Sequence, residues 1–151
     1  MLTKFRILLL LCLLPGLYSC ATNTGGSLSP VRELPDASHP FIATPRVGKS
    51  DSITVIYNPV YCEKIGDACG FFRLNAFAHD FLNHQIYPEP KYYPKASLRD
   101  ADCFAAKYGK PEEVTAAIEF LENRDRYSDV PVYGDPAARA DLIRSCAANK
   151  S

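Results

Sequence analysis

A long apolar stretch, from Phe71 to Ile86, constrains the fold of this chain more than any other feature of its sequence. Side chains three or four positions apart lie on one face of a helix, and here such a stripe runs along the whole stretch. Further apolar residues occupy the other sides, and a helix of this kind is buried at the centre of a domain. We therefore expect a central helix over residues 71–86, closed by Pro88. The stripe consists of Phe72, Ala76, His79, Asn83 and Ile86.

The remaining sequence predicts a small sheet and more helices. Residues 53–57 are β-branched and aromatic, which is typical of a strand, and Asn58 and Pro59 predict a turn after it. The expected fold class is therefore α+β, mainly α, with a sheet of few strands around the buried central helix. Further helices are expected at residues 97–108, from Pro111 onward and from Pro136 onward.

The first residues predict export. Lys4 and Arg6 precede a short apolar run that is too short to cross a bilayer, as in a signal peptide. The run ends in Leu-Tyr-Ser-Cys, which resembles a bacterial lipobox, so that residues 1–19 would be removed and Cys20 would be acylated. Ala21 is compatible with an outer-membrane lipoprotein that faces the periplasm. The alternative is ordinary cleavage with Cys20 in the removed peptide.

The segment after the signal peptide is predicted to be a tether. Residues 20–49 are rich in Thr, Gly, Ser and Pro, a composition that favours a flexible chain. Phe41 and Ile42 can pack on the domain as an extended arm, which could add a strand or two to the sheet. Residues 50–151 are then expected to form one domain with one core.

An even number of cysteines in an exported chain indicates disulfides. Three pairings of the four cysteines are possible, and we favour Cys62 with Cys69, closing a loop, and Cys103 with Cys146. A zinc site made of cysteines is the alternative, but the tight C-x-x-C spacing of such sites is missing. The cysteines that follow the predicted signal peptide are Cys62, Cys69, Cys103 and Cys146.

The charges argue against a nucleic-acid partner. The chain has 17 basic and 17 acidic residues, and they are interspersed rather than grouped. A nucleic-acid-binding surface needs a basic patch or stripe. The expected partners are the membrane, through the lipid anchor, and a protein or peptide ligand.

The central helix carries residues that suggest metal chemistry. Two histidines four positions apart on a helix can share a zinc ion, and a glutamate after the first can polarise the bound water. Here His79 and Asn83 have that spacing, and Asp80 is shorter than a glutamate by one methylene group. An amide oxygen is a poorer zinc ligand than imidazole. His84 would lie roughly 140° around the helix from His79.

The order of these motifs resembles the compact bacterial zinc metallopeptidases of the H-E-x-x-H type, in a minimal gluzincin-like form. The resemblance covers roughly residues 50 to 147 and implies an α+β peptidase scaffold. It also supports the Cys103–Cys146 pairing. The matching segments are the strand ending in Tyr57-Asn58-Pro59, the helix with residues 78–85, a second helix with Ala101-Asp102-Cys103 and a last helix with residues 139–146.

The resemblance assigns degenerate roles to the residues of the central helix. His79 falls on the first zinc-ligand position, and Asp80 falls on the position of the general base. Asn83 falls on the second ligand position, and His84 follows it. The metal site would thus keep one of the two helix ligands.

The second helix completes the implied site. Asp102 matches an aspartate that orients a ligand histidine in such enzymes. The third ligand is typically a glutamate one turn earlier, where this chain has Leu98, so that only Asp100 or Asp102 could take its place. Alternatively, both are first-turn acids that the helix dipole favours, and His79 is a helix histidine bonded to Asp102 or to a carbonyl.

Three functions remain open on these grounds. The first is a pseudoenzyme that binds a protein, a peptide or an envelope component in the old cleft, whose rim would include Tyr87, Tyr92 and Tyr93. No cofactor is expected in that case. The second is an active, divergent zinc metallopeptidase that uses His79, His84 and an aspartate, with Asp80 or Glu89 as base. The third is a structural envelope lipoprotein.

Overall fold

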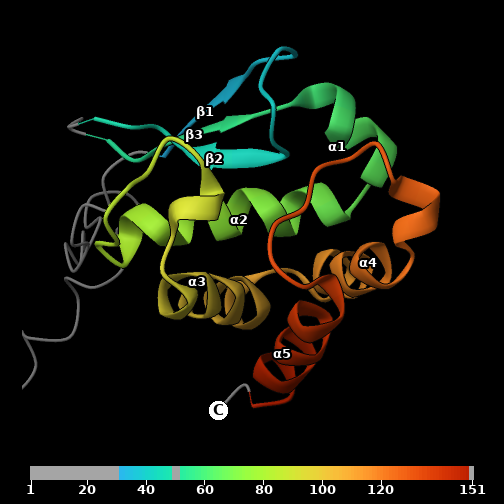
Figure 1. Cartoon of the computed structure of the whole chain (residues 1–151). Helices are drawn as coiled ribbons and strands as arrows, with labels where there is room; N and C mark the ends of the chain where they lie inside the picture. The colour runs from blue at the N-terminus through green and yellow to red at the C-terminus, as the bar shows by residue number, and fades with distance from the viewer. Residues whose placement is uncertain (1–30, 49–51, 150–151) are drawn as a thin grey trace, which may run out of the picture.

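The computed structural model describes residues 31–48 and 52–149, and these form a three-stranded sheet and five α-helices (Figure 1). The predicted α+β, mainly helical class is confirmed. The predicted signal peptide and the predicted acylation site at Cys20 lie outside the described residues. Within the described part of the chain, no helix has the length and apolarity needed to cross a bilayer.

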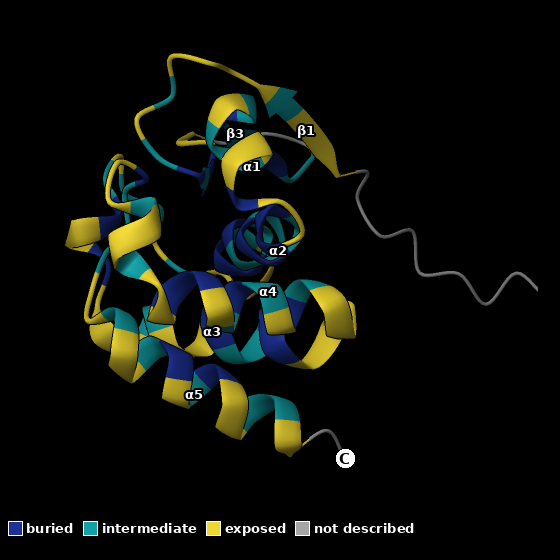
Figure 2. Ribbon diagram, turned by 90° about the vertical axis from the view of Figure 1, so that its right-hand side faces the viewer, coloured by how far each residue is buried: buried dark blue, intermediate teal, exposed yellow. Residues whose placement is uncertain are grey.

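Helix α2 (Ala68–Phe81) is the centre of the domain, as the sequence predicts. It packs against α1, β2 and β3 on one side and against α3 and α4 on the other. Figure 2, which looks along α2, shows its mainly buried residues enclosed between these layers. The core around it includes Phe71 and Phe72 of α2, Phe120 of α4 and Ile143 of α5.

The sheet begins earlier in the chain than expected. β1 (Arg32–Pro35) pairs parallel with β3 (Thr54–Tyr57), and β2 (Ala43–Pro45) pairs antiparallel with the other edge of β3. The prediction of a tether up to residue 49 is therefore wrong for the described residues 31–48. Their local composition favours a flexible chain, but pairing with β3 and burial of Ile42 give these residues a fixed place. The predicted arm with added strands is confirmed.

Helix α1 (Pro59–Ile65) occupies a segment that was predicted to be a turn and a loop. The side chain of Asn58 accepts hydrogen bonds from the backbone N–H groups of Val60 and Tyr61, at 2.9 and 3.2 Å. Pro59 takes the first helical position, where its missing N–H costs nothing. The Asn-Pro pair that ends the strand is thus also the start signal of a helix.

The remaining helices cover the other side of α2. α5 packs on both α3 and α4 as an outer layer (Figures 1 and 2). Asp135 caps α5 through hydrogen bonds from Ala137 and Ala138. α3 begins two residues before the predicted Ser97. These elements are the short 3₁₀ turn η1 (Pro90–Tyr92), α3 (Lys95–Tyr108), α4 (Pro111–Glu122), the 3₁₀ turn η2 (Arg124–Tyr127) and α5 (Pro136–Ala148).

Two disulfides link the helices, and both favoured pairings are confirmed. Cys62 and Cys69 connect α1 to α2, with their Cα atoms 4.9 Å apart. Cys103 and Cys146 connect α3 to α5, with their Cα atoms 5.1 Å apart. The second bond fixes the outer helix to the layer that covers α2.

Candidate functional site

The central helix ends at Phe81, five residues before the predicted end. The N–H of Asn83 donates to the carbonyl of Asp80, and the N–H of His84 donates to the carbonyl of His79, both at 2.9 Å. Asn83 has a φ of 55°, in the left-handed region that glycine and asparagine tolerate best. These features define a Schellman cap, with Asn83 at the left-handed position. Asn83 is exposed and ends the helix rather than facing a metal from within it.

The cap brings His84 back onto His79. The two Nδ1 atoms are 3.1 Å apart, and the rings meet edge to face. On its other side, Nε2 of His84 lies 3.9 Å from a carboxylate oxygen of the exposed Asp100. The expectation that His84 points roughly 140° away from His79 is therefore wrong, because the helix stops before His84.

His79 is closed off from water. Its side chain is only 4% exposed, and the ring of Tyr93 covers it with a centroid distance of 4.2 Å. Burial, together with smaller effects of the nearby His84 and Arg139, lowers the pKa of His79 to about 4. At neutral pH His79 is thus an uncharged imidazole that shares a hydrogen bond with His84.

Asp102 is held by a cation of the protein itself. Nε and Nη2 of Arg139, on α5, donate to its two carboxylate oxygens at 2.9 and 2.7 Å. The amide of Asn75 donates a third hydrogen bond, at 2.9 Å, and Asp102 is 1% exposed. Burial tends to lower the pKa of Arg139, but the Asp102 carboxylate raises it above the usual value. The predicted contact between Asp102 and His79 is therefore not formed.

Arg139 is a residue that the sequence alone did not single out. It lies 37 positions after Asp102, and no local pattern links the two residues. Its Nη1 also donates to the carbonyl of Tyr133, at 3.3 Å. The buried pair joins α3 to the first turn of α5 and to the loop before it.

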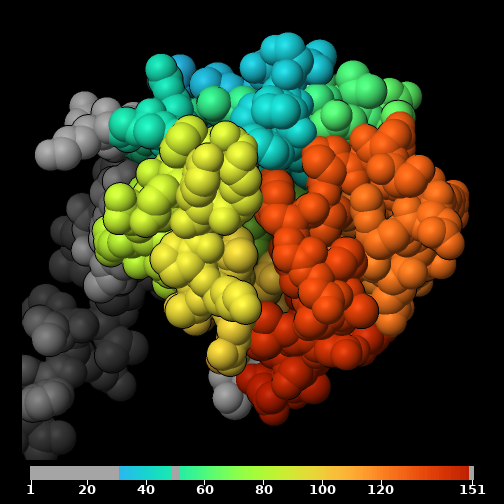
Figure 3. Space-filling view, viewed as in Figure 1, coloured from blue at the N-terminus to red at the C-terminus, as the bar shows by residue number. Residues whose placement is uncertain are grey.

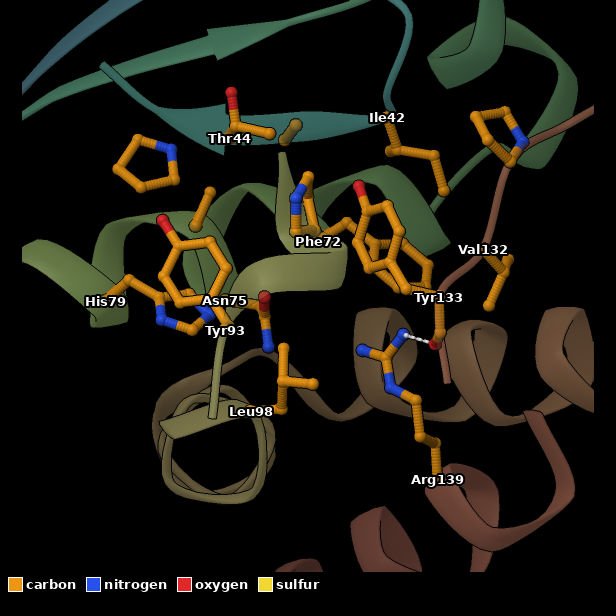
Figure 4. A pocket seen from close by; sticks show the side chains of 15 residues that line it. Ile42, Thr44, Phe72, Asn75, His79, Tyr93, Leu98, Val132, Tyr133 and Arg139 are labelled. Atoms are coloured by element: carbon orange, nitrogen blue, oxygen red, sulfur yellow. Dashed lines mark hydrogen bonds between the residues drawn. The ribbon is translucent and has the colours of Figure 1, made fainter. Parts of the chain in front are cut away.

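Three of these residues, Asn75, His79 and Arg139, line a small hollow beside α2. In Figure 4 the ring of Tyr93 lies beside His79 on one side, Tyr133 and Arg139 lie on the other, and Asn75 and Leu98 lie between them. Its cavity volume is about 20 Å³, room for one or two water molecules. In Figure 3 the segments around residues 90 and 133 meet below β2 and cover most of α2. No peptide chain fits inside the hollow as it stands.

The hollow does not fit a catalytic zinc ion. Two nitrogens bound to one tetrahedral zinc lie about 3.3 Å apart, so the His79 and His84 pair alone has a suitable spacing. Asp100 approaches the other ring nitrogen of His84, and Asp102 is engaged by Arg139. Among residues 31–48 and 52–149, no three His, Cys, Asp or Glu side chains converge on a metal position. A third protein ligand is therefore missing from this arrangement.

The two candidate bases are also placed unfavourably. Asp80 is partly buried on α2 but does not line the hollow. Glu89 forms an ion pair with Lys91, at 2.7 Å. The structure thus brings together His79, His84 and, more loosely, Asp100, and neither of the two bases lines the hollow.

The predicted tyrosine rim is partly formed. The rings of Tyr87 and Tyr93 meet edge to face at 5.3 Å, and burial raises the pKa of Tyr93. Tyr92 is 53% exposed on the adjoining 3₁₀ turn. Tyr133, from the loop before α5, completes the rim on the other side of the hollow.

Comparisons with known proteins add no assignment, since no family model, curated protein or solved structure matches the chain. The resemblance to zinc metallopeptidases, which the order of the motifs suggests, stays a prediction. The function has to be argued from the geometry of the site.

Proposed function

We propose that this chain is an exported, lipid-anchored domain on a metallopeptidase-like scaffold that binds a protein, a peptide or an envelope component without cleaving it. The observation that carries the proposal is the pairing of Asp102 with Arg139. A guanidinium group neutralises the buried carboxylate that would otherwise support a metal site. Leu98 adds an apolar side chain to the same hollow.

The number of available ligands supports a function without hydrolysis. Catalytic zinc sites use three protein ligands and one water, and the ion lowers the pKa of that water to about 7. His79 and His84 offer two nitrogens, and the N···N contact of 3.1 Å already satisfies both. An ion held by two imidazoles alone would be bound weakly, and neither Asp80 nor Glu89, the two candidate bases, lines the hollow.

A ligand would bind over the rim rather than in the hollow. The rim presents the exposed ring of Tyr92 and the partly buried ring of Tyr133, rigid groups that give contact area at a low cost in side-chain entropy. A small side chain of the ligand could enter between the two tyrosines. An extended or loop-shaped peptide surface is therefore the ligand that this site fits best.

Selection from a random peptide library on the immobilised protein tests this proposal. Leu98→Trp should fill the hollow and weaken the selected peptides, whereas Arg99→Trp, at the exposed next position, should leave them unchanged. Thermal unfolding of both variants checks that each is folded. If no peptide is enriched, or if both variants bind alike, the site is not a binding site and a structural role is favoured.

An active, divergent metallopeptidase is the second candidate, and the approach of His84 to His79 is the observation that favours it. The cap brings a second imidazole to the first, which a regular helix continued through residue 84 would not do. This candidate requires cleavage of a general protein substrate that a chelator abolishes and that Asp80→Ala abolishes too. Absence of such cleavage in the purified protein would exclude it.

A further inference from the structure

Exposed apolar side chains gather on the side of α2 that faces away from the hollow. Phe77 and His79 are two positions apart on α2, which places them about 200° apart around the helix axis. His79 faces the hollow, so Phe77 faces the opposite side. Two large apolar residues that are exposed there are Phe81 and Tyr108, and Tyr108 is 71% exposed.

Four aromatic rings from α2 and α3 form a ladder on this side. The rings of Phe77 and Phe81 stack at 5.3 Å, and Phe81 contacts Phe104 at 5.3 Å. Phe104 then contacts Tyr108, at 4.6 Å. The ladder holds its outer rings in place, so that Phe81 and Tyr108 are presented to the outside by a rigid support.

The ladder continues into an open groove of about 430 Å³ between β1, α2 and the junction of α3 and α4. Val31, Val55, Leu74, Phe77 and Tyr108 supply its apolar lining. We call the ladder and the groove together the aromatic face.

The charges at the groove are paired. Arg73 binds Glu33, with Nε 3.0 Å from a carboxylate oxygen, and Lys110 binds Glu113 at 3.1 Å. The groove therefore carries little net charge. It fits an uncharged or zwitterionic surface better than a strongly charged partner.

The chain outside the described structure begins at this face. Val31 is the first described residue and lines the groove. Residues 21–30 separate it from Cys20, and the eleven steps between the two Cα atoms can span at most about 40 Å. A lipid anchor on Cys20 would therefore reach the domain from the side of the aromatic face.

We propose that the aromatic face rests on the lipid surface that holds the anchor. This inference depends on the proposed function, because it needs the acylated Cys20. Exposed Tyr and Phe rings are suited to the boundary between headgroups and acyl chains. Docking by this face would turn the hollow and its tyrosine rim away from the membrane, toward ligands in the surrounding space.

A single tryptophan can report on this orientation, because the chain contains no Trp. We would place it by Tyr108→Trp on the aromatic face and, as a matched control, by Tyr92→Trp on the tyrosine rim, where the native side chain is 53% exposed. Each full-length, acylated variant is reconstituted into phosphatidylcholine vesicles, with and without bromine on the acyl chains near the headgroup. If the aromatic face docks, the emission maximum of the tryptophan at position 108 should shift to the blue when vesicles are added, and its intensity should fall when the lipid is brominated. The tryptophan at position 92 should show neither change.

Three results would overturn the inference, and they can be told apart. If the protein does not float with the vesicles and mass spectrometry finds no acyl group on Cys20, the lipid anchor is refuted, and the proposed docking is refuted with it. Vesicle-bound protein with equal emission in both lipids at position 108 refutes docking alone. A blue shift at position 108 without quenching, together with a dimer mass in detergent, shows that a second copy covers the aromatic face instead.

Discussion

Replacing Arg139 with methionine should destabilise the domain strongly. The substitution leaves the Asp102 carboxylate, which is 1% exposed, with one hydrogen bond from Asn75 instead of three. Removing one partner of a buried ion pair typically costs about 3–5 kcal/mol, since the other charge stays buried without compensation. For a domain of this size, that loss lowers the melting temperature by about 10 °C or more.

Two further variants make this test specific. Arg144→Met removes an arginine from the same helix, but Arg144 is 43% exposed and its partners Glu122 and Asp141 lie at the surface, so the expected loss of stability is small. The double variant Asp102→Leu with Arg139→Met removes both charges and should recover most of the loss. Urea unfolding with both disulfides intact measures all of them. A cost for Arg139→Met no larger than that for Arg144→Met would refute the buried-pair argument.

Three more predictions concern stability. Asn83→Gly should be neutral or slightly stabilising, and Asn83→Ala should cost about 1 kcal/mol in urea unfolding, because position 83 is left-handed. The pKa of His79 is about 4 in the folded chain, because the ring is buried, and 6.5 in the unfolded chain. The free energy of unfolding should therefore be unaffected by His79 above pH 6.5 and should fall by up to about 3 kcal/mol as the pH drops toward 4. Loss of the Cys103–Cys146 bond should cost about 4 kcal/mol, and loss of the Cys62–Cys69 bond about 2.5 kcal/mol, because the first closes the longer loop.

Each of these predictions has a result that would contradict it. Equal stability of the Gly and Ala variants at position 83 would argue against the helix cap. An unchanged pH dependence in His79→Gln would assign the loss at low pH to other groups. A larger effect of Cys69→Ser than of Cys146→Ser would show that loop length does not govern the contribution of the two bonds.

The sequence predicts the features of the fold that depend on local patterns. The apolar periodicity around Phe72 and Ala76 locates the central helix, and proline at a first helical position marks the starts of α4 and α5. The features that it leaves open depend on non-local contacts. The sequence predicts an arm that adds a strand or two, but it does not give the bounds or the partners of β1 and β2, which are stabilised by pairing with β3.

The candidate site was harder to predict for the same reason. His79 and His84 were recognised, but their contact depends on the left-handed conformation of Asn83, which a helical periodicity that continues to Ile86 conceals. The pair of Asp102 and Arg139 joins two helices that are far apart in the sequence. An asparagine near the end of an apolar helix, which tolerates the left-handed conformation, is a local signal that indicates such a cap.

The zinc content of the purified protein tests the central claim most directly. The claim is that the hollow beside α2, with Asp102 paired to Arg139 and no third ligand in place, does not hold a catalytic metal ion. After incubation with zinc and dialysis, elemental analysis should find far less than one zinc per chain, with no difference between the native chain and His79→Ala. One firmly held zinc per chain that is lost in His79→Ala would contradict the account.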